Sequence, residues 1–356
     1  MTPPPIGVGM LGYAFMGKAH SRALHAVAQF EPALEPRLVS IAGRNAEAVE
    51  EARGRLRWEE AVTDWREQVQ DARIDLHVNG GPNALHAEPT IEAVRAGKHV
   101  LCEKPLARTA DEALAMWSAA EQSGVVHACG FNYRFVPAIR RARELVESGE
   151  LGEIVHFRAR YLQSWGWDAP PAWRFDREVA GSGALGDLGA HSIDLARYLV
   201  GESVAVSAVV RTFVDGHEVD DAFVATVEFA NGAIGTLEAS RLATGRINQN
   251  TWELNGSRGS LAFDQERMNE LQVGDARGFR RLLEHGDWWP PGHIVGWGDT
   301  FTYEYLNLLS AIAGAGAVGP QGATFEDGYR CAEVCDAIAR AAASGSREEI
   351  TYREAA

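Results

Sequence analysis

Two short segments of the chain carry side chains that could move a proton to or from an alcohol. Lys104 follows the apolar segment 99–102, which is predicted to be a strand, and Pro105 fixes the backbone after it. Asp187 and His191 are four residues apart in a predicted helix, so both side chains should point from one helix face. An imidazole titrates near neutrality and can pass a proton, and a lysine can bind a hydroxyl or carbonyl oxygen. Simpler interpretations stay open: Lys104 could be a surface lysine paired with Glu103, and the Asp–His pair could be a buried cap or half of a metal site.

Three glycines near the start of the chain have the spacing of a dinucleotide-binding turn. Gly7, Gly9 and Gly12 follow Ile6 and precede a segment, 13–20, that is predicted to be helical. In such a turn the glycines allow a tight bend, a close approach to a pyrophosphate, and close packing of helix on strand. Because 37 of the 356 residues are glycine, an ordinary glycine-rich turn is the alternative.

The first 130 residues alternate predicted strands and helices, which is the pattern of a doubly wound parallel sheet. The predicted strands are 6–10, 37–42, 74–79, 99–102 and 125–129. The predicted helices are 18–30, 46–53, 65–70, 88–96 and 111–123. Ligands of such sheets bind beyond the carboxyl ends of the strands, which is where Lys104 should lie.

After Gly130 the pattern becomes that of an α+β domain with a large, mainly antiparallel sheet. The predicted strands are 154–162, 204–214, 222–229, 233–239, 250–254 and 260–263. The predicted helices are 138–148, 186–199, 300–313 and 325–343. Asn231-Gly232 between two strands predicts a hairpin with a type I′ turn. We therefore expect an α/β chain with two domains, residues 1–130 and 131–356.

Composition narrows the class of protein. The hydrophobic fraction of 46% is that of a globular protein, and no apolar run is long enough to span a membrane. The net charge of −15 argues against nucleic acid and anionic membrane surfaces as partners. The start of the chain lacks the features of a signal peptide, and four cysteines fit reduced thiols, so a cytoplasmic location is expected. Cys331 and Cys335, one helical turn apart, indicate a buried helix face better than a zinc site, and no metal is expected.

Several motifs in this order resemble the glucose–fructose oxidoreductase/inositol dehydrogenase (Gfo/Idh/MocA) family of NAD(P)-dependent oxidoreductases. Besides the glycines, the motifs are the segments 82–86, 96–106, 132–134 and 183–194, and the resemblance covers nearly the full length. It implies a Rossmann domain that binds NAD, with NADP also possible. It implies a second domain whose open antiparallel sheet binds substrate and forms a homodimer or homotetramer.

The resemblance also assigns roles to single residues. Lys104, Asp187 and His191 match the family's catalytic set. The implied cofactor-binding residues are Gly7, Gly9, Gly12, Phe15, Met16, Gly43, Arg44, Pro82, Asn83, His86, Glu103, Lys104, Asn132, Trp173 and Arg174. The implied substrate-binding residues are Lys104, Tyr133, Arg134, Gln163, Trp165, Asp187 and His191.

The loops 161–165 and 173–175 look most like those of sugar 3-dehydrogenases within the family. The expected substrate is therefore a secondary alcohol of a pyranose or anhydrosugar, at C3. Two groups of tryptophans support a sugar site, because aromatic rings suit the C–H faces of pyranoses. We expect at least one of these tryptophans to line the site. These are Trp165, Trp167, Trp173, Trp288, Trp289 and Trp297. The alternatives are a cyclitol dehydrogenase, glycoside cleavage through a transient 3-keto intermediate, and a nucleotide-sensing protein without catalysis.

The chain departs from the family pattern in two places. Gly43-Arg44-Asn45 stands where the family often has Asp after the second strand, and Gly80-Gly81 precedes Pro82-Asn83 in place of a hydroxyl residue. That Asp holds the ribose of NAD and repels a 2′-phosphate. Because it is absent here, the choice between NAD and NADP stays open. We expect both cofactors to bind, with NAD slightly favoured for catalysis.

Overall fold

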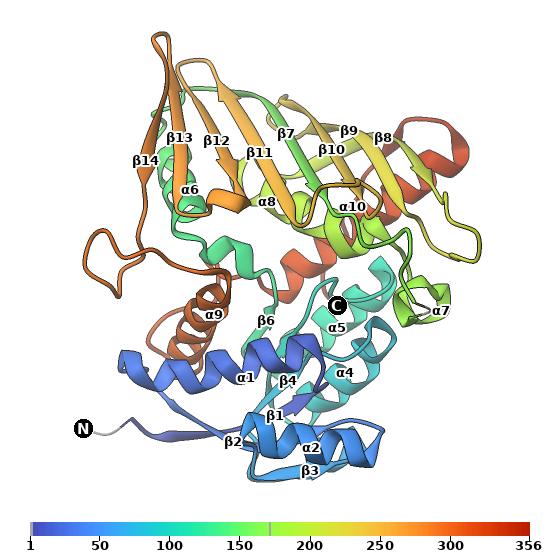
Figure 1. Cartoon of the computed structure of the whole chain (residues 1–356), viewed down its shortest axis with the longest axis vertical. Helices are drawn as coiled ribbons and strands as arrows, with labels where there is room; N and C mark the ends of the chain where they lie inside the picture. Colours follow the sequence, from blue (N-terminus) through green and yellow to red (C-terminus); the bar gives the residue numbers. More distant parts are fainter. Residues whose placement is uncertain (1–2, 171) are drawn as a thin grey trace.

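The computed structural model describes residues 3–170 and 172–356 and contains two sheets (Figure 1). The lower sheet has six parallel strands in the order β3-β2-β1-β4-β5-β6. Its strands are β1 Pro5–Leu11, β2 Glu35–Ala42, β3 Glu60–Val62, β4 Leu76–Asn79, β5 His99–Cys102 and β6 His127–Cys129. The helices are α1 Phe15–Val27, α2 Ala46–Leu56, α3 Trp65–Gln70, α4 Ala87–Arg95 and α5 Ala110–Ser123. The predicted doubly wound parallel sheet is confirmed, with β3 as an additional short edge strand.

The upper sheet has nine strands in the order β14-β13-β12-β11-β7-β10-β9-β8-β15. Its strands are β7 Ile154–Leu162, β8 Ser203–Arg211, β9 Ala222–Phe229, β10 Ile234–Ser240, β11 Gln249–Gly256, β12 Ser260–Asp264, β13 Glu270–Asp275, β14 Gly278–Leu283 and β15 Glu348–Glu349. Among the described residues, β7 and β10 pair in parallel and every other pair is antiparallel. The prediction of a large, mainly antiparallel sheet is confirmed, but β13, β14 and β15 were not predicted.

The hairpin between β9 and β10 forms with a different turn from the predicted one. Gly232 has φ 88°, and its N–H donates to Phe229 O at 2.9 Å. Asn231 is not among the described residues with positive φ, although a type I′ turn needs positive φ at both central positions. A type I turn followed by a left-handed glycine closes this hairpin instead.

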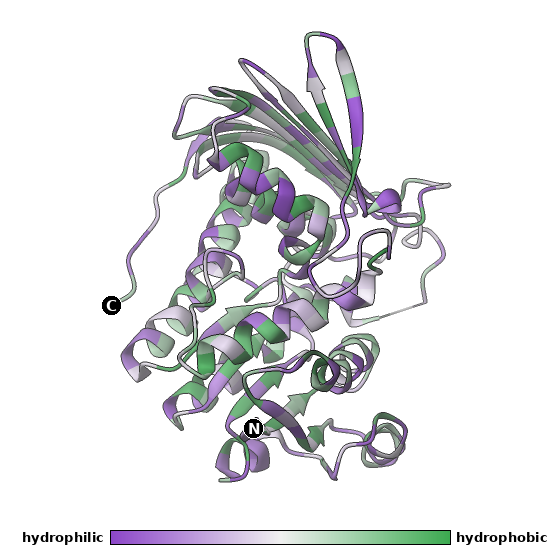
Figure 2. Cartoon of the chain, turned by 90° about the vertical axis from the view of Figure 1, so that its left-hand side faces the viewer, coloured by the Kyte–Doolittle hydropathy of each residue, from purple (hydrophilic) through white to green (hydrophobic). Residues whose placement is uncertain are grey.

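Helices cover one face of the upper sheet, as the view in Figure 2 shows. They are α6 Pro137–Glu147, α8 Ala190–Leu199 and α10 Phe325–Ser344. Side chains along β9 alternate accordingly: Phe223 and Val227 are buried in the core, whereas Val224 and Glu228 are exposed on the other face. The outer face is mixed, because apolar residues such as Ile234 alternate with threonines and charged groups.

The chain returns from the upper sheet to cover the lower one. Helix α9, Trp297–Ile312, packs against α1, and its Phe301 and Leu308 join Val8 and Leu24 in one hydrophobic core. A short helix, α7 Arg177–Ala180, approaches the segment after β4. The two sheets are therefore joined by packing on both sides of the space between them.

Candidate active site

A cleft of about 930 Å³ lies beyond the carboxyl ends of the lower strands and is closed above by segments of the second half of the chain. Ligands of doubly wound sheets bind at this position. Most of the predicted site residues line it. They are Gly12, Phe15, Met16, Gly43, Arg44, Pro82, Asn83, His86, Glu103, Lys104, Asn132, Tyr133, Gln163, Trp165, Trp173, Arg174, Asp187 and His191.

Gly7 and Gly9 do not reach the cleft, so the predicted register of the glycine turn is wrong. Both lie inside β1, where a Cβ on Gly7 would stand 1.7 Å from Arg73 O and one on Gly9 2.8 Å from Ile74 Cδ1. Their small size serves the packing of the strand against the segment before β4.

The turn itself begins at Gly12, five residues later than predicted. Gly12 has φ 100°, and a Cβ there would lie 2.5 Å from Gly80 O. Helix α1 begins at Phe15, and a Cβ on Gly17 would lie 2.5 Å from Gly12 O. Gly12, Ala14 and Gly17 thus occupy the three positions of the fingerprint, with alanine in place of the middle glycine.

The three predicted catalytic side chains converge at one end of the cleft. Lys104 Nζ donates to Asp187 O at 2.7 Å and lies 3.3 Å from Asp187 Oδ1. Asp187 lies in a π-helical segment, Leu185–Gly189, that continues into α8 at Ala190. Such wide turns are frequent at functional sites, and this one places Asp187 and His191 in the same wall of the cleft.

Asp187 has a second cationic partner that the sequence did not reveal. Arg241, which follows β10, is 1% exposed and donates from Nη2 to Asp187 Oδ2 at 3.0 Å. Its guanidinium also lies over the Trp165 ring, 4.9 Å from the centroid. Removal from water would by itself raise the pKa of Asp187, but the charges of Lys104 and Arg241 outweigh it and hold that pKa well below its usual range.

His191 is buried among aromatic rings. Its ring centroid lies 4.4 Å from that of Tyr133 and 5.8 Å from that of Tyr161, and Nδ1 has no hydrogen-bond partner among the described residues. Burial, reinforced by the positive charge of Lys104, lowers the pKa of His191 well below its ordinary value. The imidazole is therefore neutral near pH 7 and can accept a proton.

A chain of hydrogen bonds continues from His191's aromatic neighbours along the cleft. The Tyr133 and Tyr161 hydroxyls are 2.9 Å apart, and the Tyr161 hydroxyl donates to Asn248 Oδ1 at 2.8 Å. Gln163 donates to the same Asn248 oxygen, and its own Oε1 accepts from Trp165 Nε1 at 2.5 Å. These hydrogen bonds hold in fixed positions four side chains that line the cleft, those of Tyr133, Tyr161, Gln163 and Trp165.

Arg134 was predicted to bind substrate, and that prediction is wrong. Its side chain is buried away from the cleft and donates to Asp194 at 2.6 and 2.9 Å. Asp327 lies 3.1 Å from the same guanidinium. Since Asp194 is on α8 one turn after His191, Arg134 fixes the helix that carries the imidazole.

Three of the six predicted tryptophans, Trp165, Trp173 and Trp297, line the cleft. Trp297 stacks on Phe15 with ring centroids 5.5 Å apart. Trp288 and Trp289 pack around Phe30 on another part of the surface. The prediction that at least one tryptophan lines the cleft is confirmed.

Glu103 is not the partner of the Lys104 ammonium. Its Oε1 lies 2.9 Å from His20 Nε2, and the other ring nitrogen of His20 lies 2.9 Å from the Tyr305 hydroxyl. Glu103 Oε2 accepts the Lys104 backbone N–H. The buried His20 and Tyr305 thereby anchor the turn that presents Lys104.

The cofactor side of the cleft is shaped by glycines and leaves room for a dinucleotide. A Cβ on Gly43 would lie 2.2 Å from the Tyr13 ring, so only glycine lets Tyr13 lie over the end of β2. Asn83 donates to Ala180 O at 2.9 Å and ties this side to α7. The positive φ of Gly12, the helix N-terminus at Phe15 and these close approaches fit an anionic dinucleotide.

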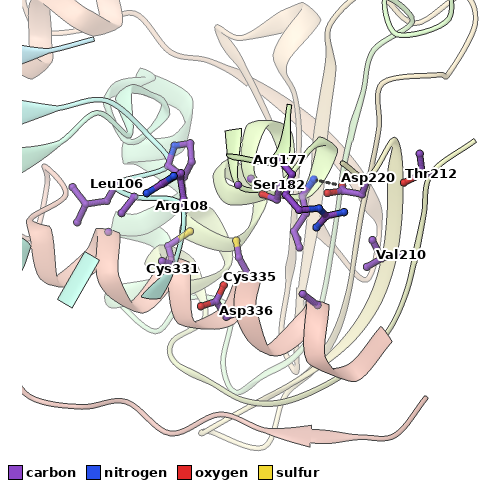
Figure 3. Close-up of a pocket in the computed structure, with 18 of the residues that line it drawn as sticks. Leu106, Arg108, Arg177, Ser182, Val210, Thr212, Asp220, Cys331, Cys335 and Asp336 are labelled. Carbon is purple, nitrogen blue, oxygen red and sulfur yellow. Dashed lines mark hydrogen bonds between the residues drawn. The ribbon is translucent and has the colours of Figure 1, made fainter. Parts of the chain in front are cut away.

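A smaller cavity of about 200 Å³ lies behind the loop that follows Lys104 (Figure 3). Pro105 and Ser182 line both this cavity and the cleft. Cys331 and Cys335 face it from α10, as Figure 3 shows, and both are free thiols. Cys331 is buried and Cys335 partly so, which agrees with the predicted helix face directed inward. Within the part of the chain that is described, no three His, Cys, Asp or Glu side chains gather as metal ligands would.

Fold and site define a two-domain oxidoreductase whose first domain binds a dinucleotide. Residues 6–131 match the oxidoreductase family with an NAD-binding Rossmann fold, and residues 139–262 match the GFO/IDH/MocA C-terminal domain. The chain belongs to the Gfo/Idh/MocA family of oxidoreductases, as the sequence motifs predicted. In the described residues, no helix is both long and apolar enough to cross a membrane.

The relatives include enzymes named for sugars. The levoglucosan dehydrogenase of Pseudarthrobacter phenanthrenivorans is 42% identical, over 97% of this chain and 98% of its own length. The 1,5-anhydro-D-fructose reductase of Ensifer adhaerens is 31% identical, over 82% of this chain and 84% of its own. A structure of levoglucosan dehydrogenase in complex with NADH and L-sorbose superimposes with a TM-score of 0.95, at 41% identity, over 98% of this chain and all of that one.

Proposed function

We propose that this protein is an NAD-dependent dehydrogenase that oxidises a secondary alcohol of a sugar, with an anhydropyranose such as levoglucosan as the first candidate and C3 as the reacting carbon. The observation that carries the proposal is the convergence of Lys104, Asp187 and His191 in a cleft that fits a dinucleotide. The aromatic rings of Trp165 and Trp173 line the same cleft and suit the C–H faces of a pyranose. The similarity to levoglucosan dehydrogenase supports this choice of substrate.

The side chains divide the work of the reaction. His191, neutral and buried, takes the proton of the reacting hydroxyl. The Lys104 ammonium stabilises the negative charge that develops on that oxygen. Asp187, ionised between two cations, accepts a hydrogen bond from a neighbouring hydroxyl and so orients the ring. A nicotinamide dinucleotide held by the turn at Gly12 and the first turn of α1 would supply the hydride acceptor, the one function for which the protein has no group of its own.

A substrate panel tests the proposal. The purified protein is mixed with NAD⁺ and, separately, levoglucosan, glucose, a methyl glucoside and myo-inositol, and reduced cofactor is followed by its absorbance. We expect the anhydrosugar to give the highest kcat/KM. The position of oxidation is then read from the product by nuclear magnetic resonance. No reduction with any sugar contradicts the proposal, whereas a preference for myo-inositol replaces it with a cyclitol dehydrogenase.

We propose further that the open face of the upper sheet is an interface between copies of this chain. Val209 and Val224 are neighbours across β8 and β9, and both are exposed, as is Ile234 on β10. Because exposed apolar groups on a sheet favour a cover, light scattering should give a multiple of the 38.7 kDa chain mass. Changing Val209 and Val224 to glutamate should dissociate the assembly. A monomer at micromolar concentration in the unaltered protein contradicts this proposal.

A further inference from the structure

A second groove, of about 510 Å³, lies on the outer side of α1 and has a lining separate from that of the cleft. It is bounded by α1, the end of α2, the segment before α9 and the first turns of α9. Four cationic side chains line it, against the single carboxylate of Asp299: Lys18, Arg22, Arg55 and Arg57. The chain as a whole has a net charge of −15. The excess of positive charge in this groove is therefore opposite in sign to the charge of the whole chain.

The cations come from two elements. Lys18 and Arg22 are four residues apart on α1 and share a face. Arg57 follows α2 in the left-handed region, with φ 62°. Arg22 is paired with Asp299 at 2.9 Å, and Arg55 with Glu51 at 3.0 Å. Lys18 and Arg57 have no ion pair among the described residues, so two positive charges remain free for a ligand.

Aromatic rings form another wall of the same groove. Trp288 is fixed between Phe30, at 4.2 Å, and Tyr303, at 3.6 Å between ring centroids. Trp289 meets the edge of Phe30 at 5.6 Å and is 48% exposed. Trp289 thus lies beside this stack, in edge contact with Phe30, and leaves part of its indole exposed for a flat ring to cover.

We propose that this groove binds a nucleoside phosphate, with the base on the ring of Trp289 and the phosphates on Lys18 and Arg57. Bases stack on aromatic side chains whatever their identity, and lysine and arginine bind phosphate through charge-assisted hydrogen bonds. A volume of about 510 Å³ lies in the range of small-molecule sites. The site is distinct from the proposed sugar and cofactor cleft and does not depend on the proposed function.

The test measures binding of ATP by calorimetry to the full-length protein saturated with NADH, so that the Rossmann cleft is already occupied. We expect one further site per chain, with an affinity that falls as salt rises from about 50 to about 200 mM, because the cations are exposed. The double variant Lys18→Gln/Arg57→Gln should bind at least about tenfold more weakly. The matched control is Arg277→Gln, an exposed arginine beyond β13 whose side chain is 88% exposed, and it should bind like the unaltered protein.

Trp289→Ala separates base recognition from simple attraction of an anion. We expect ATP to bind at least about fivefold more weakly to this variant, and inorganic tripolyphosphate to bind the unaltered protein less tightly than ATP does. Absence of ATP binding to the NADH complex would overturn the proposal. Equal binding of tripolyphosphate and ATP, or unchanged affinity in the Lys18/Arg57 double variant, would overturn it as well.

Discussion

Arg241 and Lys104 hold Asp187 from opposite oxygens: Arg241 Nη2 lies 3.0 Å from Oδ2, and Lys104 Nζ lies 3.3 Å from Oδ1. The carboxylate is thus fixed in its ionised form between an arginine that follows β10 and a lysine that follows β5. Arg241 lines the cleft as Lys104 does, but its side chain is 1% exposed, and its Nη1 and Nη2 already donate to Arg174 O and Asp187 Oδ2. We therefore infer that the arginine acts on substrate through Asp187. We regard Arg241 as a positioning residue.

Replacing Arg241 by glutamine should raise the sugar's KM and lower kcat/KM by at least about tenfold. With one cation gone, Asp187 rotates more freely and its pKa rises toward its usual value. Steady-state kinetics across pH would show this as a new loss of activity on the acid side. Arg246→Gln, at an exposed turn after β10, is the matched control and should leave the pH profile unchanged. A uniform loss of activity at every pH would indicate a structural role only.

Lys104→Met and His191→Ala should each lower kcat by at least about a hundredfold, the usual size of acid–base and electrostatic contributions. Binding of NADH should change little, since both side chains lie at the end of the cleft next to Asp187. Stopped-flow measurement of a single turnover, together with a fluorescence titration of NADH, separates the two effects. Turnover close to that of the unaltered enzyme in either variant is incompatible with the roles proposed here.

The pH dependence of sugar oxidation should reflect the depressed pKa of His191. Burial, and then the charge of Lys104, favour the neutral imidazole, which is the form that accepts a proton. Activity should therefore persist as pH falls below about 6.5, the ordinary histidine value, and be lost only when His191 finally protonates. The profile of kcat/KM between about pH 5 and about pH 9 measures this. An acid limb at or above the ordinary histidine value contradicts it.

The fold and the proposed catalytic trio were accessible from the sequence because their signals are local. Alternating strands and helices indicate the parallel sheet. The position of Lys104 just after β5 indicates that it lies at the edge of this sheet where ligands bind. Asp187 and His191 share a helix face by spacing alone, although the π-helical geometry of the segment that carries Asp187 leaves no such mark in the residues. The spacing of these residues did not indicate which reaction they carry out, whereas the family motifs did.

The residues that were missed or misplaced depend on contacts between distant segments. Arg241 is 54 residues from Asp187 in the chain, and nothing around it in the sequence distinguishes it from a surface arginine. Arg134 belongs to a motif, yet its partner Asp194 is 60 residues away. The glycine turn was shifted because Gly7 and Gly9 imitate its spacing, while the alanine at position 14 conceals the true one.

His77 should make the protein less stable in mild acid. It is fully buried in β4, neither ring nitrogen has a hydrogen-bond partner among the described residues, and burial lowers its pKa to about 4. Below about pH 6.5 the His77 ring binds a proton in the unfolded chain but not in the native state. The free energy of unfolding therefore falls as pH falls. This costs about 1.4 kcal/mol at one unit below the ordinary pKa.

Calorimetric melting at pH 7.5 and pH 5.5, taken as about one unit on either side of the ordinary histidine pKa, tests this expectation. His77→Phe should lose less of its Tm between the two conditions than the unaltered protein does. Because no described group pairs with the His77 ring, the phenyl ring leaves no partner unsatisfied. An equal loss of Tm in both proteins shows that other groups cause the acid sensitivity.

Cofactor choice depends on the end of β2, where Gly43 replaces the expected acid. Tyr13 lies over Gly43, Arg44 is exposed beside the cleft, and Asn45 is already engaged, because its Oδ1 accepts the Ala48 N–H at 3.0 Å. Of the described residues that line the cleft beside Gly43, Arg44 is the single cation, and one guanidinium without a second cation makes a weak 2′-phosphate site. We expect NAD⁺ and NADP⁺ both to bind, with catalysis favouring NAD⁺.

Titration calorimetry of Arg44→Ala should show weaker NADP⁺ binding and nearly unchanged NAD⁺ binding. If NADP⁺ binds the unaltered protein more than about tenfold tighter, about 1.4 kcal/mol, and Arg44→Ala removes that margin, then Arg44 alone is sufficient for a phosphate site and the preference is reversed.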